Sequence, residues 1–137
     1  DAYKNVLSTI NSIRTNTEKL IMVFGCGGDR DAEKRSKMTA IACNMSDQVI
    51  ITADNPRTEK IEDIISDMTA KLDPVQKKKV LVITDRSQAI KTACTLASDG
   101  DIVMIAGKGH EKYQEIEGVK HYFDDVEELV ESLNINQ

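Results

Sequence analysis

The sequence predicts an α/β fold with a Rossmann-like, mostly parallel sheet flanked by helices. Short continuous apolar runs alternate along the chain with longer amphipathic segments, and this alternation is typical of βαβ units. Each run is bounded by glycine or polar residues, which favours strands buried on both faces. The 137 residues suit one domain with one hydrophobic core, so we expect residues 1–137 to fold as a unit.

Five segments carry the spacing of amphipathic helices. The first, residues 6–13, is irregular. The others place apolar residues at positions i, i+3, i+4 and i+7, so each predicts a helix with one apolar stripe against the core. These four segments are residues 38–45, 61–68, 90–97 and 126–133.

The continuous apolar runs that predict strands are residues 20–25, 49–52, 80–84 and 102–106. The last part of the chain differs, because residues 113–116 and 120–123 flank Gly118-Val119. This pattern predicts a hairpin or an antiparallel edge strand near the C-terminus. The three lysines at 77–79 precede the third run and are predicted to lie in a solvated loop.

Composition and charge exclude several classes of function. Lys and Arg number 18 and Asp and Glu number 23, a net charge of −5, whereas a binder of nucleic-acid backbones needs a basic surface. Aromatic residues make up 4% with no Trp, too few for base stacking. No apolar run approaches the roughly 18 residues of a membrane span. We therefore expect a cytoplasmic protein that binds neither nucleic acid nor membrane.

The three cysteines, Cys26, Cys43 and Cys94, predict neither a disulfide framework nor a zinc cluster. Their number is odd and no CxxC spacing occurs. Cys26 falls in a loop near positive charge, which can lower a thiol pKa. No histidine lies nearby in the sequence, so we favour a packing or turn role for Cys26.

Charged residues follow each predicted strand, at residues 25–31, 54–58, 85–87 and 107–111. Ligands of open α/β sheets bind at the carboxyl ends of the strands, so we expect these loops to share one functional edge. A surface rich in charges of both signs suits a zwitterionic amino acid. An arginine can bind the carboxylate of such a ligand, and an Asp or Glu can accept hydrogen bonds from its ammonium group. The charged residues are Arg30, Arg57, Arg86 and Lys108 beside Asp29, Asp31, Asp54, Asp85 and Glu111.

Each loop alone also has a structural interpretation. Glycines after a strand form tight turns, and Asp85 or Ser87 can cap the start of a helix. Two nucleotide motifs are incomplete. Gly25-x-Gly27 is followed by Arg30 where a dinucleotide fingerprint needs its third glycine, and no Walker A pattern surrounds Gly107-Lys108-Gly109.

Taken together, three loop sequences make the chain recognisable. They are FGCGGDRD at 24–31, DNPRTE at 54–59 and AGKGHE at 106–111, supported by Lys34-Arg35, Met38 and Tyr113-Gln114. The chain resembles the C-terminal domain of the Mur ligases, and most of all the MurE type, from about Ala2 to Leu133. The resemblance implies the Rossmann-like fold of that domain and a place in peptidoglycan precursor synthesis.

The resemblance also implies an ATP-dependent acid–amino-acid ligase. Such enzymes convert the carboxylate of a UDP-N-acetylmuramoyl dipeptide into an acyl phosphate, which the amine of the incoming amino acid attacks. They have three domains, and ATP and Mg²⁺ are bound mainly by the central one. We expect this chain to be the third, amino-acid-binding domain, cut from its parent near Asp1. It would work with the N-terminal and central domains and be inactive alone, with no metal site of its own.

Residue roles follow from the resemblance position by position. The tetrad Asp54-Asn55-Pro56-Arg57 matches the motif associated with meso-diaminopimelate, and Asn55 and Arg57 would face the distal end of that amino acid. Arg30 is matched to a ligand carboxylate, and Gly107 and Glu111 to the distal ammonium group. Nucleotide or domain-closure contacts are assigned to Asp29, Asp31, Lys108 and His110.

Three alternatives stay open. The first is an L-lysine-adding ligase of the same family, which Arg57 argues against because lysine lacks the second carboxylate. The second is a stand-alone Rossmann-like module that binds a small ligand or a partner protein. The third is a dinucleotide-dependent enzyme, weakened by the missing glycine at Arg30.

Overall fold

The structure, a computed structural model, describes residues 2–13, 17–28, 32–106, 113–116 and 119–135. Its centre is a four-stranded parallel sheet with the strand order β3-β2-β1-β4. The strands are β1 (Leu20–Phe24), β2 (Gln48–Ile51), β3 (Val80–Val82) and β4 (Ile102–Ala106). The predicted α/β class and its parallel sheet are confirmed.

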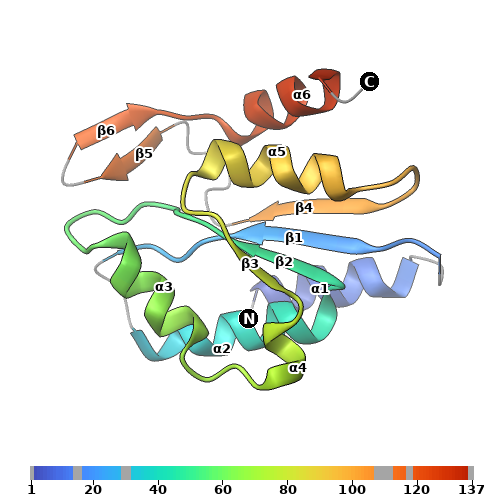
Figure 1. Cartoon of the computed structure of the whole chain (residues 1–137), viewed down its shortest axis with the longest axis horizontal. Coiled ribbons are helices and arrows are strands. Elements are labelled where there is room, and N and C mark those ends of the chain that lie inside the picture. Colours follow the sequence, from blue (N-terminus) through green and yellow to red (C-terminus); the bar gives the residue numbers. More distant parts are fainter. Residues whose placement is uncertain (1, 14–16, 29–31, 107–112, 117–118, 136–137) are drawn as a thin grey trace.

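Helices cover both faces of this sheet, as Figure 1 shows. One side carries α1 (Ala2–Ile13), α2 (Ala32–Met45), α3 (Ile61–Thr69) and the short α4 (Pro74–Lys77), and the other carries α5 (Arg86–Leu96) and α6 (Asp125–Ile135). The five predicted helices are present. Helix α4 has no apolar periodicity to predict it. It is set by a capping box in which Asp73 accepts from the Gln76 backbone and Gln76 accepts from Asp73.

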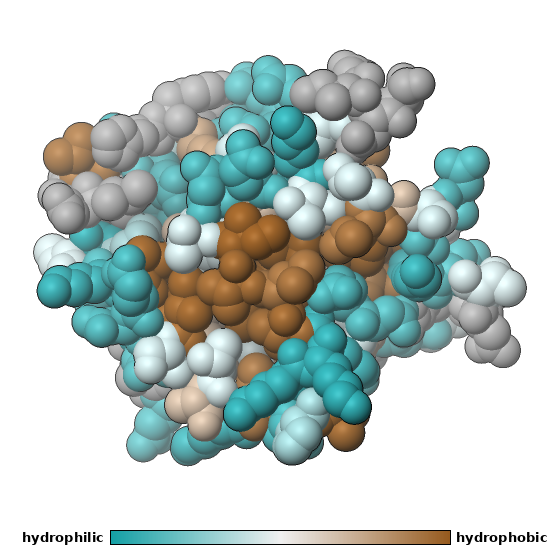
Figure 2. Space-filling model, in the orientation of Figure 1, coloured by the Kyte–Doolittle hydropathy of each residue, from teal (hydrophilic) through white to brown (hydrophobic). Residues whose placement is uncertain are grey.

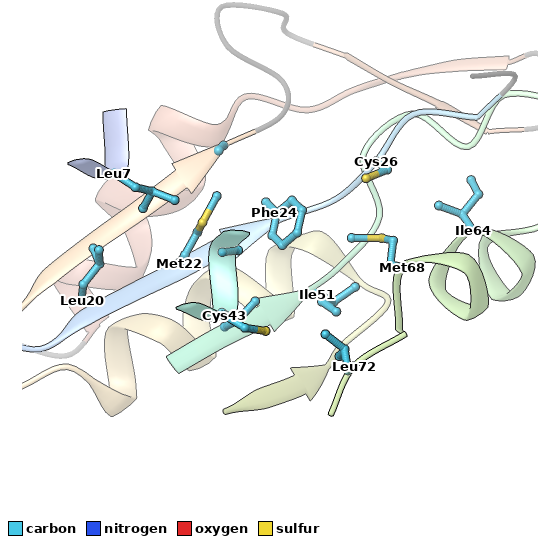
Figure 3. Packing of buried hydrophobic residues seen from close by; sticks show 13 residues of the cluster. Leu7, Leu20, Met22, Phe24, Cys26, Cys43, Ile51, Ile64, Met68 and Leu72 are labelled. Carbon is cyan, nitrogen blue, oxygen red and sulfur yellow. The ribbon is translucent and has the colours of Figure 1, made fainter. Parts of the chain in front are cut away.

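The core is divided into two layers by the alternation of side chains along β1. Leu20, Met22 and Phe24 point toward α1, α2 and α3, where they join one buried cluster. Figure 3 shows Phe24 amid this cluster, with side chains from β2, α2 and α3 around it. Ile21 and Val23 join a second cluster against α5. Since successive strand residues face opposite sides, one continuous apolar run serves both layers.

Strand β3 differs from the prediction of burial on both faces. It is the edge strand of the sheet, and Leu81 and Val82 are 42% and 48% exposed. Figure 2 shows apolar surface at the centre of this view, where Figure 1 places β3. An apolar run therefore identified the strand correctly but could not identify its place in the sheet.

Helix α6 corrects a second expectation. Of its four periodic apolar residues only Leu129 packs on the core, whereas Val126, Val130 and Leu133 are exposed. The buried face of α6 instead carries Asp125 and Ser132. Polar partners on α5 account for this, because Arg86 and Ser87 bind side chains of α6.

The C-terminal strands β5 (Tyr113–Ile116) and β6 (Val119–Tyr122) pair antiparallel as a two-stranded sheet. The predicted hairpin is confirmed, and it is separate from the main sheet rather than its edge. The lysine run needs a partial correction. Lys77 and Lys78 are exposed, but Lys79 is half-buried and its Nζ donates to the carbonyls of Cys43 and Ser46 at the end of α2.

The strand order places a topological switch point between β1 and β4. From β1 the chain steps outward through β2 to β3 and then returns to the far side of β1 as β4. In doubly wound sheets ligands bind outside the carboxyl ends of the strands at such a point. The loop that follows β1 is therefore the first place to look for a site.

Candidate functional site

The loops after β1 and β2 lie directly against each other. The backbone N–H of Gly28 donates to the carbonyl of Asn55 at 2.7 Å. A Cβ atom on Gly28 would clash with the backbone of Pro56, and one on Gly25 with the backbone of Thr52. These glycines are thus required for close approach between two loops, which is more than the tight turn that either could make alone.

Arg57 lies where these two loops meet. Its Nη1 donates to the carbonyls of Gly28 at 3.1 Å and Asn55 at 3.3 Å. Its φ of 54° is left-handed and it is the one non-glycine residue with positive φ among the described residues. Such a conformation costs about 1–3 kcal/mol and persists only where surrounding contacts hold it, as happens at functional sites.

Only part of the donor capacity of the Arg57 guanidinium is used within the described residues. The side chain is half-buried. Within the described residues, Nε and Nη2 donate no hydrogen bond. Together they form one edge of the planar fork, the arrangement that grips a carboxylate through two parallel bonds. The Arg57 side chain therefore has the donors that a carboxylate ligand would need.

Asp54 and Asn55 are both buried, at 8% and 1% exposure. The carbonyl of Asp54 accepts from Gln114 Nε2 at 2.9 Å, which ties the β5–β6 hairpin to the loop after β2. The carbonyl of Asn55 accepts from Gly28 and Arg57, as described above. The tetrad is thus fixed from both sides, by the loop after β1 and by the hairpin.

Arg35, on α2, braces the same pair of loops from beneath. Its side chain is 3% exposed. Its Nη1 and Nη2 bind the two carboxylate oxygens of Glu59 at 3.0 and 2.7 Å, Nη2 reaches the Gly27 carbonyl at 3.1 Å and Nη1 reaches Asp67 on α3 at 2.9 Å. The bond to Glu59 is the main reason that the pKa of Arg35 is raised.

Arg86 was expected on the charged functional edge, and the structure buries it instead. Its guanidinium binds Asp125 through two bonds and donates to the carbonyls of Ala53 and Ala106. It thus ties the ends of β2 and β4 to the start of α6. Asp85 accepts from the Gln88 backbone as the N-cap of α5, so the structural interpretation of this loop is confirmed.

A cleft of about 880 Å³ opens beside the tetrad. Its walls include Pro56 and Thr58, the start of α3 at Lys60, the Asp85 cap and Phe123. Neither Asn55 nor Arg57 lines it. Within the tetrad, Pro56 is the residue that lines this cleft, together with Asp85 and Arg86 at the start of α5.

Seven of the expected site residues lie outside the described residues. They are Asp29, Arg30, Asp31, Gly107, Lys108, His110 and Glu111. Their assigned roles stay predictions.

Cys26 is buried at 6% exposure. Burial raises the pKa of its thiol to about 11, outweighing the attraction of the nearby Arg35 charge, which alone would lower the pKa. The expectation of a packing role is confirmed, because Cys26 belongs to the buried cluster that contains Phe24 and Met68.

Comparison with known proteins identifies the family. The profile described as "Mur ligase, glutamate ligase domain" matches residues 1–109. The chain belongs to the Mur ligase family.

Curated relatives of this Mur ligase chain share half of its residues. A protein of Cytophaga hutchinsonii is 54% identical over 97% of the chain, one of Bacteroides fragilis 53% over 98%, and one of Clostridioides difficile 51% over 98%. Each is named UDP-N-acetylmuramoyl-L-alanyl-D-glutamate–2,6-diaminopimelate ligase. The chain spans only 27–28% of the length of these relatives.

A solved structure of a protein with the same name has the same fold. It matches 99% of this Mur ligase chain with a TM-score of 0.91 and 48% identity, and the match covers 27% of that protein. The predicted family and fold are both confirmed.

The described part of the Mur ligase chain holds no group of three or more His, Cys, Asp or Glu residues placed to bind a metal ion. None of its helices is long and apolar enough to cross a bilayer.

Arg35, Glu59 and Gln114 stand within the family motifs of the sequence, but the motifs predicted no role for them. One signal was available for Arg35. It stands three positions before Met38 and seven before Ala42, in line with the apolar stripe of α2. A charge on that stripe predicts a buried and paired side chain.

Proposed function

We propose that this chain is the amino-acid-binding domain of a ligase that adds meso-diaminopimelate to UDP-N-acetylmuramoyl-L-alanyl-D-glutamate. The carrying observation is Arg57, held in a strained backbone conformation with one edge of its guanidinium left for a carboxylate. The names of the relatives and the DNPR tetrad support the same substrate.

The chemistry of this domain is positioning rather than proton transfer. Arg57 and Asn55 would hold the distal end of diaminopimelate, with Arg30 on a carboxylate and Gly107 and Glu111 at the distal ammonium group. Binding there brings the nucleophilic amine to the activated carboxylate and so lowers the entropic part of the barrier. Closure of the domain over the site would exclude water from the acyl phosphate.

ATP and Mg²⁺ are assigned to the other domains of the enzyme, where ATP supplies the phosphoryl group that activates the dipeptide carboxylate. Asp29, Asp31, Lys108 and His110 stay assigned to nucleotide or closure contacts. The domain would work in the cytoplasm, where the nucleotide-linked precursor is made, with its own N-terminal and central domains as partners. Alone it would have no ligase activity.

Selectivity follows from the second carboxylate. Diaminopimelate carries one carboxylate more than lysine, so a bound lysine leaves Arg57 without its partner. Sites built around a polar substrate group reject analogues that lack the group by about 10⁴-fold or more. The single arginine contributes on the order of 1.5–3 kcal/mol through its charged hydrogen bonds.

The test is a ligation assay with the full-length enzyme that carries this domain, ATP, Mg²⁺ and the UDP-muramoyl dipeptide. Meso-diaminopimelate and L-lysine are supplied in separate reactions and products are read by mass. Product with diaminopimelate alone is expected. Product with lysine alone would keep the family and overturn the argument from Arg57, and product with neither would favour a binding module.

The role of Arg57 is tested in the same assay by Arg57→Ala. The amino-acid KM should rise roughly 10²-fold, at about 1.4 kcal/mol per tenfold. Lys71→Ala removes an exposed positive charge beyond the end of α3, away from the cleft, and serves as the control. Equal KM changes in the two variants would assign the effect to general electrostatics.

A further inference from the structure

We propose that Arg35 and Glu59 form a positioning pair for Arg57, fixing the loops after β1 and β2 in the relative placement that diaminopimelate recognition needs. The inference rests on the proposed function and extends it to two residues that have no ligand role in it. Neither residue needs to touch the substrate.

The hydrogen bonds of Arg35 connect both loops to the residues on either side of Arg57. Arg35 binds the Gly27 carbonyl in the first loop and the Glu59 carboxylate in the second. Gly28, next to Gly27, supplies the carbonyl that accepts from Arg57. Glu59 follows Arg57 by two residues, and its N–H donates to the Pro56 carbonyl to close the turn between them. Arg57 is thus bounded on both sides by residues that Arg35 holds.

These contacts are stiff because the Arg35 side chain is buried and its bond to Glu59 joins opposite charges. Arg35 is 3% exposed, and its bond to Glu59 uses both terminal nitrogens at 2.7 and 3.0 Å. A two-point guanidinium–carboxylate bond fixes direction as well as distance. Arg57 needs such support, because a non-glycine residue at a φ of 54° reverts to ordinary backbone geometry unless its surroundings hold it.

A purely structural role for Arg35 makes a different prediction, and the molecule supplies the control. Arg35 has a second carboxylate partner, Asp67, at 2.9 Å. Asp67 lies on α3, eight residues beyond Glu59, and is 43% exposed. If Arg35 serves only to hold α2 against the elements beside it, then losing either carboxylate should have similar consequences. If it positions Arg57, only the loss of Glu59 should alter substrate selection.

The experiment compares Glu59→Gln with Asp67→Asn in the full-length ligase. Each variant removes one charge partner from the same guanidinium and keeps the side-chain shape. The kinetic constants for diaminopimelate and lysine are measured together with the melting temperature. Glu59→Gln should raise the KM for diaminopimelate about tenfold or more with little change in kcat, an effect of the size seen when partners that orient metal ligands are lost.

The decisive quantity is the ratio of kcat/KM for diaminopimelate to that for lysine. This ratio should fall about tenfold or more in Glu59→Gln and stay within about twofold of wild type in Asp67→Asn, even if both variants melt at lower temperature. Equal ratios in the two variants would overturn the positioning role. A wild-type enzyme that does not prefer diaminopimelate would instead overturn the proposed function, and this inference with it.

Discussion

Arg86 and Asp125 join α5 to α6 through two parallel hydrogen bonds, Nε to Oδ1 at 2.7 Å and Nη2 to Oδ2 at 2.8 Å. The arginine side chain is wholly buried and the aspartate is 11% exposed. The same guanidinium also donates to the carbonyls of Ala53 and Ala106. One side chain therefore holds the ends of β2 and β4, where two of the loops expected to contact the substrate begin. The pair therefore links the packing of α6 to the geometry of the sheet edge.

Breaking this pair should be costly. Arg86→Met is expected to lower the free energy of unfolding by about 3–5 kcal/mol, because Asp125 is left as a buried charge without its partner. Urea denaturation followed by circular dichroism measures the change. The double variant Arg86→Met/Asp125→Leu should recover part of the loss, since it removes the stranded charge. A loss below about 1 kcal/mol for Arg86→Met would show that water reaches the aspartate.

Gly28 should tolerate no side chain. Gly28→Ala is expected to cost about 1–3 kcal/mol, because the added Cβ meets the Pro56 backbone and must push two loops apart. Gly100→Ala is the matched control: its φ of +89° strains any side chain, but no atom lies within 4 Å of the new Cβ. That control should cost about 1–2 kcal/mol and leave the diaminopimelate KM unchanged, whereas Gly28→Ala should raise it. Similar KM values in both variants would contradict the close-approach argument.

The Cys26 thiol should be inert in the folded chain. With a pKa of about 11, roughly one thiol in a thousand is ionised at pH 8, and the thiolate is the reactive form. Labelling with iodoacetamide at pH 8, read by peptide mass, should leave Cys26 unmodified until urea is added. Rapid labelling without urea would contradict its burial.

The same pKa shift makes stability depend on pH. Folding raises the pKa of Cys26 from 9.0 to about 11, so between these values the unfolded chain loses the thiol proton while the folded chain keeps it. The contribution of this group to stability is full below about pH 9 and falls by about 1.4 kcal/mol per pH unit up to pH 11. Cys26→Ala should flatten this part of the profile in urea denaturations. An unchanged slope would assign the alkaline loss to other groups.

Lys79 should contribute to stability although its neighbour should not. Its Nζ donates to the carbonyls of Cys43 and Ser46 at 2.9 and 3.2 Å, and charged hydrogen bonds of this kind contribute about 1.5–3 kcal/mol. Lys79→Met is expected to lower the free energy of unfolding by about 1.5 kcal/mol, the low end of that range, because the Lys79 side chain is only half-buried. Lys78→Met, at an exposed position, should stay within about 0.5 kcal/mol of wild type. Equal changes in stability for the two variants would show that the Lys79 side chain contributes no more than a solvated one.

The sequence by itself determined the elements and the order in which they occur. Side-chain periodicity encodes burial locally, so the strands, five helices and the hairpin could be assigned without tertiary information. The motif residues of the loops also determined the family, since they are contiguous in the chain. Arg35 and Arg86 also stand in line with the apolar stripes of their helices. This is a signal of burial, although Arg86 was expected at the functional edge and no role was predicted for Arg35.

Only the tertiary structure decided which residues these charges meet. Glu59 lies 24 positions from Arg35, and Asp125 lies 39 from Arg86. No local pattern chooses such partners, because the choice depends on how helices cross the sheet. For the same reason β3 proved to be an exposed edge and α6 turned polar residues inward. The pairing of Gly28 with Asn55, and with it the setting of Arg57, exists only because parallel strands bring two distant loops to one edge.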